Sequence, residues 1–248
     1  KVKASSHQKV KLAIVDLDGV LRGKYINKEK FLSAAESGFG FCNVVFGWDC
    51  ADVCYDNVQY TGWHSGYPDA EARIDLSTFR EVPWDDKVPF FLADFHDGKG
   101  KSLEVCPRQL LKSVVNKAHN AGYAPSMGFE FEFFNFRETA QTLHEKGFAN
   151  LTPITPGMFG YSLLRASENQ EYFSALMDEL LEFGVPIEGL HTETGPGVFE
   201  AAILYGKPVE AADRATLFKA GTKEIARRFG IIPTFMAKIS PDLPGCSG

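Results

Sequence analysis

Two acidic stretches hold the residues of this sequence that are best suited to chemistry. In the first, residues 128–136, Glu130 and Glu132 stand two apart in a run dominated by phenylalanine, which predicts a buried β-strand. Because side chains alternate along a strand, both glutamates project from the same face. Neighbouring carboxylates repel each other and resist burial, so we expect a divalent metal ion to balance their charge. A half-exposed edge strand, with phenylalanine inside and glutamate in water, explains the same pattern.

The second acidic stretch is residues 187–203, which predicts a strand, a Gly-Pro-Gly turn and a second strand. Glu193 and Glu200 lie on opposite sides of this turn, so a hairpin brings them together; the alternative is two exposed glutamates at a loop tip. If the two acidic stretches are neighbours in one sheet, four carboxylates surround one cavity. Such a cluster suits one or more hard divalent ions, with an anionic phosphate completing the charge balance.

A third acidic motif follows an apolar strand at residues 11–15. Asp16-Leu17-Asp18-Gly19 resembles the first motif of haloacid-dehalogenase-type phosphatases, in which the first aspartate is the nucleophile and the second a general acid/base. The alternative is a β-hairpin, because Asp-Gly favours a tight turn and residues 22–25 can begin the returning strand. The late acidic pair that such phosphatases need is missing from the sequence, which favours the hairpin.

The elements that must position these residues divide into two parts. Residues 9–104 predict a small, mostly β unit with a helix at 28–35, strands at 41–46, near 74–84 and at 88–94, and a long polar loop at 47–69. Residues 105–248 predict an α+β unit. Its helices are expected from Pro107 to just before Gly122, at 168–183 with a capping box at 167–170, and at 208–229; strands are expected at 123–136 and 231–239, and a loop at 137–161. The first of these helices carries an apolar stripe: Leu110, Leu111, Val114, Val115 and Ala118.

Composition narrows the possible partners. The chain has 248 residues and a net charge of −6, which argues against nucleic acid as a ligand. Its apolar runs are all shorter than the roughly 20 residues needed to cross a bilayer, so we expect no membrane association. The five cysteines are odd in number and match no zinc-binding spacing, which favours free thiols in a reducing cytoplasm.

The motifs together resemble those of the glutamine synthetase family. Residues 128–134 resemble its Gly-x-Glu-x-Glu-Phe strand, residues 193–200 its Glu-x-x-Pro-Gly-Gln-x-Glu hairpin, and residues 234–238 its Thr-Phe-Met-Pro-Lys strand. Residues 16–24 fit the opening strands of the family's N-terminal domain. The motifs occur in the family's order and spacing from about residue 9 onward.

The resemblance implies an α+β protein with a small N-terminal β-grasp domain at 9–104 and, at 105–248, part of a catalytic domain with a curved antiparallel sheet flanked by helices. It implies an ATP-dependent ligase that joins the γ-carboxyl of glutamate to ammonia or another amine through a γ-glutamyl phosphate. By motif position, Glu132, Glu193 and Glu200 would hold one Mg²⁺ or Mn²⁺, and Glu130 would hold a second that bridges the nucleotide phosphates.

Further residues follow from the same resemblance. Glu188 and Tyr205 fall where the family contacts ATP, and Gly245 aligns with a glycine that touches substrate glutamate. Val198 replaces the usual glutamine, and Ala237 and Ile239 replace the prolines that flank the family's lysine. These departures concern the identity of the substrate, and the choice of amine is not evident from the sequence.

The resemblance also implies a homo-oligomer of stacked rings. It implies that this chain corresponds to about the first half of such an enzyme, ending before the family's metal-binding histidine, phosphate-binding arginines and flap glutamate. No catalytic side chain is therefore assigned, and a fragment of this length is expected to be inactive alone. A catalytically silent structural homologue, like the relative found in the eye lens, is the alternative; retention of all four glutamates argues against it.

Overall fold

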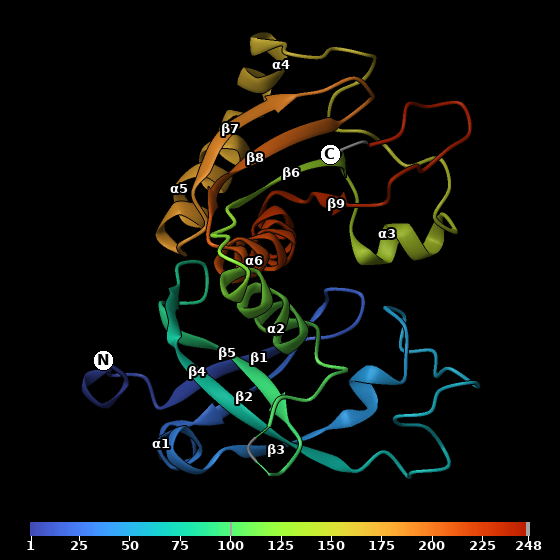
Figure 1. Ribbon diagram of the computed structural model, residues 1–248. Coiled ribbons are helices and arrows are strands. Elements are labelled where there is room, and N and C mark those ends of the chain that lie inside the picture. The colour runs from blue at the N-terminus through green and yellow to red at the C-terminus, as the bar shows by residue number, and fades with distance from the viewer. Residues whose placement is uncertain (100, 247–248) are drawn as a thin grey trace. The chain divides into compact units, whose positions relative to one another are not determined.

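The structure, a computed structural model, describes residues 1–99 and 101–246. The chain forms two compact units, unit 1 at Lys1–Pro125 and unit 2 at Ser126–Gly248 (Figure 1). The two compact units meet after Pro125, later in the chain than the domain boundary that the sequence predicted at 104/105. The predicted boundary at 104/105 stays a prediction. Among the described residues, no helix combines the length and apolar character needed to cross a membrane.

Unit 1 contains a five-stranded sheet in the order β2-β1-β5-β4-β3. Its strands are β1 (Lys9–Val15), β2 (Leu21–Asn27), β3 (Phe39–Cys42), β4 (Asp69–Val82) and β5 (Val88–His96). Strands β1 and β5 pair in parallel at the centre, and the other pairs are antiparallel. Helix α1 (Lys28–Ser37) buries Phe31, whose ring lies 4.8 Å from that of Phe91 on β5. A mixed sheet with a helix packed on its central strands is the β-grasp arrangement expected.

The Asp16 motif forms the β1–β2 hairpin. Asp16 Oδ1 accepts hydrogen bonds from the backbone N–H groups of Asp18 and Val20, at 3.0 and 2.8 Å. Its Oδ2 accepts from Arg22 Nε at 2.7 Å, and the side chain is buried. Both oxygens of the carboxylate therefore stabilise the turn. The hairpin interpretation is confirmed, and the phosphatase hypothesis, with Asp16 as nucleophile and Asp18 as acid/base, is wrong.

Helix α2 (Pro107–Asn120) buries polar residues beside only part of the predicted apolar stripe, of which Leu111, Val115 and Ala118 are half-buried. The buried residues of α2 are Arg108 and Gln109. Leu110 and Val114, from the predicted apolar stripe, are 54% and 51% exposed. The stripe exists in the sequence, yet in unit 1 it is the polar side of the helix that contacts the sheet.

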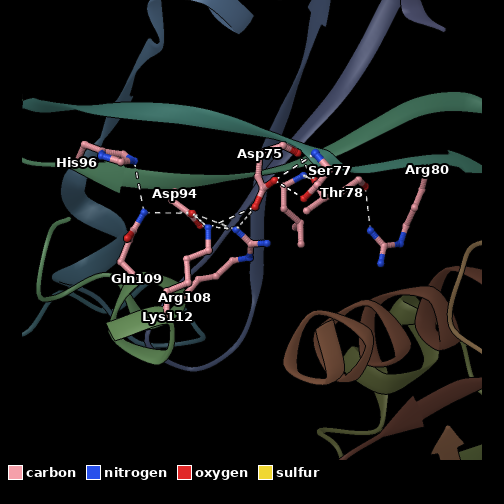
Figure 2. Close-up of polar contacts among 10 residues, drawn as sticks. Asp75, Ser77, Thr78, Arg80, Asp94, His96, Arg108, Gln109 and Lys112 are labelled. Carbon is pink, nitrogen blue, oxygen red and sulfur yellow. Dashed lines mark hydrogen bonds and ion pairs between the residues drawn. The ribbon is translucent and has the colours of Figure 1, made fainter. Parts of the chain in front are cut away.

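The polar side of α2 meets two aspartates on adjacent strands (Figure 2). Arg108 Nη1 lies 2.9 Å from Asp94 Oδ1 and 2.9 Å from Asp75 Oδ2, and Lys112 Nζ contacts both carboxylates. Asp94 and Arg108 are buried. Burial alone raises the pKa of Asp75, but the hydroxyl of Ser77 and the two cations outweigh it and hold that pKa at about 2. We call Asp75, Asp94, Arg108 and Lys112 the ionic network of unit 1.

Unit 2 contains a four-stranded antiparallel sheet in the order β7-β8-β6-β9. Its strands are β6 (Met127–Phe136), β7 (Ile187–Thr192), β8 (Val198–Gly206) and β9 (Ile232–Thr234), and its helices are α3 (Ala140–Glu145), α4 (Leu163–Glu168), α5 (Gln170–Glu182) and α6 (Pro208–Ala226). One face of the sheet packs on α5 and α6 through aromatic rings. Phe131 on β6 stacks on Phe218 of α6 at 5.4 Å, and Phe199 on β8 lies 4.4 Å from Phe173 of α5. The α+β class and the flanked antiparallel sheet are confirmed.

Several element boundaries differ from the prediction. The region 137–161, expected as a loop, contains α3. The helix expected at 168–183 is α5, which begins at Gln170 directly after the short helix α4. Its N-cap residue, Asn169, makes no side-chain cap hydrogen bond, so the capping box expected at 167–170 is wrong. Strand β9 has three residues, so the strand expected at 231–239 is mostly irregular. In unit 1, β4 has 14 residues with an irregular register between Asp75 and Arg80. Residues 43–46 form a 3-10 helix where a strand was expected.

Candidate metal centre

Three side chains form a row across the sheet of unit 2. Glu132 on β6 pairs directly with Glu200 on β8, and Glu200 pairs on its other side with His191 on β7. Directly opposed residues of neighbouring strands share a face of the sheet. Glu130, two residues before Glu132, is on this face as well, opposite Ala202. The row lies on the face opposite to the phenylalanines that pack on α5 and α6.

Glu193 reaches the row from the turn between β7 and β8. The Glu193 N–H donates to the carbonyl of Val198 at 2.9 Å, which closes the hairpin. Gly197 in this turn has a φ of +74°, and a Cβ there would lie 2.5 Å from the carbonyl oxygen of Asn135. Only glycine fits both requirements without movement. The sequence Gly-Pro-Gly therefore folds the chain so that Glu193 lies beside the row.

The distances within this group are short. His191 Nδ1 lies 3.7 Å from Glu193 Oε2, and His191 Nε2 lies 3.8 Å from Glu200 Oε2. One ligand atom from each of His191, Glu193 and Glu200 can be chosen so that all lie within 4.8 Å of one another. The side chains of Glu193 and Glu200 are 17% and 19% exposed, whereas Glu130 is exposed. The group is thus half-buried and open on the side of Glu130.

The pKa of Glu200 responds to the carboxylates of the other three predicted glutamates. Burial raises the pKa of Glu200, and the carboxylates of Glu132, Glu130 and Glu193 raise it further, while His191 acts in the opposite direction. A carboxylate whose neighbours disfavour its charge gains most from a divalent cation. The donor set, four carboxylates with one imidazole, fits Mg²⁺ or Mn²⁺ in its chemistry. We call Glu130, Glu132, Glu193 and Glu200 the glutamate cluster.

An open pocket of about 580 Å³ adjoins the cluster at Glu130. It brings together Glu130, Glu188 and Tyr205, which the sequence predicted near one ligand. Its lining is Gly128, Phe129, Glu130, Glu188, Ala202, Ile203 and Tyr205. Glu188 and Tyr205 are both exposed, so their side chains are accessible to a ligand.

Gly245 lies in the irregular segment after β9. A Cβ on Gly245 would be 3.0 Å from the carbonyl oxygen of Ala237, and the next N–H, of Cys246, donates to that same carbonyl at 2.7 Å. Burial raises the pKa of the Cys246 thiol to about 11, with a contribution from the carboxylate of Glu132. The segment that carries Gly245 therefore runs close to the glutamate cluster.

Tyr161 is a neighbour of the site that sequence analysis missed. Its ring stacks on the imidazole of His191, with centroids 4.3 Å apart and an interplanar angle of 22°. Next to it, a Cβ on Gly160 would lie 3.6 Å from Glu193 Oε1. Tyr161 stands in a stretch without periodicity, and the sequence holds no signal that links it to His191.

The fold and the site define a class: an α+β protein with a candidate metal centre of carboxylates on one face of an antiparallel sheet. A family model described as "Glutamine synthetase, catalytic domain" matches residues 104–248, and the chain belongs to the glutamine synthetase family.

Relatives agree with this family. The chain is 55% identical over 248 residues to type-1 glutamine synthetase 2 of Dictyostelium discoideum, covering 100% of this chain and 47% of the relative. It is 37% identical over 240 residues to a glutamate–isopropylamine ligase of a Pseudomonas species, covering 96% and 52%. The solved structure of a GmaS/ADP complex has a TM-score of 0.80 at 22% identity, covering 98% of this chain and 52% of that one, which shows the fold. The chain spans about half the length of the curated relatives that it matches.

Proposed function

We propose that this chain is part of an ATP-dependent ligase that joins the γ-carboxyl of glutamate to ammonia or another amine through a γ-glutamyl phosphate. The observation that carries the proposal is the convergence of three carboxylates, those of Glu130, Glu132 and Glu193, on Glu200 in a member of the glutamine synthetase family. The names of two relatives, a glutamine synthetase and a glutamate–isopropylamine ligase, support glutamate as one substrate and an amine as another.

In this proposal the glutamate cluster holds the divalent ions. Glu132, Glu193 and Glu200 bind one Mg²⁺ or Mn²⁺, and Glu130, which also lines the adjoining pocket, binds a second. When bound, such ions neutralise the phosphate oxygens, which phosphoryl transfer requires more than a covalent group from the protein. The role of the chain is to hold these carboxylates together, with Glu130, Glu132 and Glu200 on one face of the sheet and Glu193 in the adjoining turn.

The pocket beside Glu130 is the proposed nucleotide site, with Glu188 and Tyr205 as contacts. A structurally similar protein was solved as an ADP complex, which supports a nucleotide as ligand of this fold. Gly245, in the segment that passes the cluster, is the proposed contact for substrate glutamate. We also propose that the complete protein is a homo-oligomer that acts in the cytoplasm.

Metal and ATP binding test the proposal. Mg²⁺ or Mn²⁺ with ATP should raise the melting temperature of the complete protein, because a ligand that binds only the folded state stabilises it by about 2.7 kcal/mol at 100 times its Kd. Glu130→Ala and Glu193→Ala should each abolish the rise. Glu171→Ala, an exposed glutamate on α5, is the matched control and should leave it intact.

An unchanged metal response in both cluster variants would overturn the proposed centre. The reaction itself is tested by ATP turnover with glutamate and a panel of amines, using the protein at the full length of its relatives. Turnover that needs both glutamate and an amine is the expected result. Metal binding without turnover for any amine would instead favour the catalytically silent homologue.

A further inference from the structure

The proposed nucleotide pocket lies where β8 is irregularly paired with both of its neighbours. The register between β6 and β8 shifts between Met127 and Phe129, because β8 has one residue more than β6 over this stretch. The register between β7 and β8 also shifts, at Glu188. Such β-bulges turn side chains out of the regular alternation and are common beside functional sites. Glu188 and Tyr205, which stand at the two bulges, both line the pocket.

Arg214, on α6, binds the backbone of the bulge in β8. Its Nη1 donates to the carbonyl oxygens of Leu204 and Tyr205, at 2.9 and 3.3 Å. Carbonyl groups that leave a regular ladder need another donor. A guanidinium is always charged and carries its N–H groups in a fixed plane, so it can serve two consecutive carbonyls at once. Arg214 therefore fixes the piece of backbone that carries the Tyr205 side chain.

The guanidinium of Arg214 is itself held in place. Its side chain is 13% exposed, and its Nη2 donates to Glu210 Oε1, one turn earlier on α6, at 2.7 Å. A Cβ on Gly206 would lie 3.2 Å from Nη1, closer than most such contacts, so glycine at this position leaves room for the arginine. The Nε atom is buried and has no hydrogen-bond partner among the described residues. Because an unpaired buried donor is unfavourable, the contacts with Glu210 and with the two carbonyls determine where the guanidinium lies.

We propose that Arg214 is a positioning residue of the nucleotide pocket, which acts through the bulge of β8 on Tyr205. This inference rests on the proposed nucleotide function of the pocket and adds the residue that aligns its aromatic contact. The Tyr205 side chain is 64% exposed, so its position depends on its backbone more than on packing by other side chains. A contact whose backbone is already in place loses less conformational entropy when a ligand binds, and this increases affinity.

A double-mutant cycle on nucleotide binding tests this role in the protein at the full length of its relatives. The probe is ADP with Mg²⁺, and its affinity is measured by isothermal titration calorimetry. Tyr205→Ala and Arg214→Gln should each weaken binding by about 10-fold, within the range of coupling between residues that share contacts, and the double variant should bind no more weakly than Tyr205→Ala. Arg165→Gln, which removes an ion pair with Glu168 on α4, is the matched control and should leave the affinity unchanged.

Two further measurements separate positioning from general stability. Arg214→Lys keeps a cation but loses the planar arrangement of donors, so it should retain part of the affinity, and it replaces Arg214→Gln in the cycle if that variant does not fold. In steady-state kinetics, Arg214→Gln should raise the KM for ATP and leave the KM for glutamate unchanged.

The outcomes distinguish this inference from the proposed function. Losses that add in the double variant, or no loss in Arg214→Gln, would overturn the positioning role and leave the nucleotide pocket standing. An equal rise in the KM values for ATP and glutamate would also overturn it, because a general loss of structure affects both substrates. No loss of ADP affinity in Tyr205→Ala would overturn the pocket as the nucleotide site and this inference with it.

Discussion

The two units treat their buried carboxylates in opposite ways. In unit 1, Asp94 and Asp75 lie beside Arg108 and Lys112, and the pKa of Asp75 falls to about 2. In unit 2, the pKa of Glu200 rises, because burial and three neighbouring carboxylates outweigh the imidazole beside it. The ionic network of unit 1 is neutralised by side chains of the same unit. In the glutamate cluster of unit 2, the carboxylates repel one another, and an added cation would reduce this repulsion.

This difference separates carboxylates that stabilise the fold from carboxylates that we propose to bind ions. A buried ion pair is costly to break, because removal of one partner leaves the other charged and desolvated. Like charges held together are costly to keep, and a protein accepts that cost where the group has another role. Substitutions in the two units should therefore change stability with opposite sign, and each prediction below tests that contrast.

The largest effect is expected from Asp94→Ala. It removes the buried carboxylate that Arg108 and Lys112 share and leaves buried Arg108 with Asp75 as its remaining acidic partner, so we expect unit 1 to lose up to about 3–5 kcal/mol of stability. All three tryptophans, at 48, 63 and 84, lie in unit 1, so urea unfolding followed by tryptophan fluorescence reports on this unit. Asp56→Ala, an exposed loop position, is the control and should change stability by less than about 0.5 kcal/mol. A loss equal to that of the control would show that the network is not stabilising.

A smaller effect with a defined pH dependence is expected at Asp75. Its folded pKa of about 2 is below the ordinary value of 3.8, so its ionised form stabilises the folded state. This contribution, about 2 kcal/mol, is complete above pH 4 and is lost as the pH falls through about 2. Asp75→Asn should therefore be less stable than the native chain at pH 6, and the gap should shrink toward pH 2. Tryptophan-monitored urea unfolding across this range measures it, and a gap independent of pH would contradict the role of ionisation.

The smallest effect, and the opposite sign, is expected from Glu200→Gln. Removal of one charge from the cluster relieves repulsion between directly opposed strands, which is worth about 0.2–1 kcal/mol. Without metal, the amides of β6 and β8 should therefore exchange hydrogen more slowly in the variant than in the native chain. Saturating Mn²⁺ should reverse this order. Glu171→Gln on α5 is the control, and a variant less stable than the native chain in the absence of metal would remove the contrast between the units.

The candidate site was more predictable than the packing of unit 1. The alternation in residues 128–136 placed Glu130 and Glu132 on one face, and the Gly-Pro-Gly turn brought Glu193 and Glu200 onto one hairpin, because both signals are local. The register that sets Glu132 against Glu200 follows from the pairing of strands 60 to 70 residues apart, and only the family resemblance suggested it.

Helix α2 shows why the packing of unit 1 was not predictable from the sequence. Helical periodicity tells which residues share a face, but not which face packs against the sheet. Here Asp75 and Asp94, distant in sequence, turn Arg108 and Lys112 inward and leave Leu110 exposed. The position of Tyr161 beside His191 was not predicted for a related reason. Its left-handed backbone accompanies a hydrogen bond to Thr192, and tyrosine as a residue type does not favour that conformation.

Strand β6 has a consequence for how this sequence can change in length. Its odd-numbered Phe131 and Phe133 contact Phe218 of helix α6, while its even-numbered Glu130 and Glu132 belong to the cluster. Insertion or deletion of one residue near its centre would exchange the two sets, directing glutamate into the aromatic layer and phenylalanine into the glutamate cluster. Homologous chains should accordingly tolerate gaps in the region 137–161 and tolerate none between 129 and 133, so that the spacing of this segment is inherited as a unit.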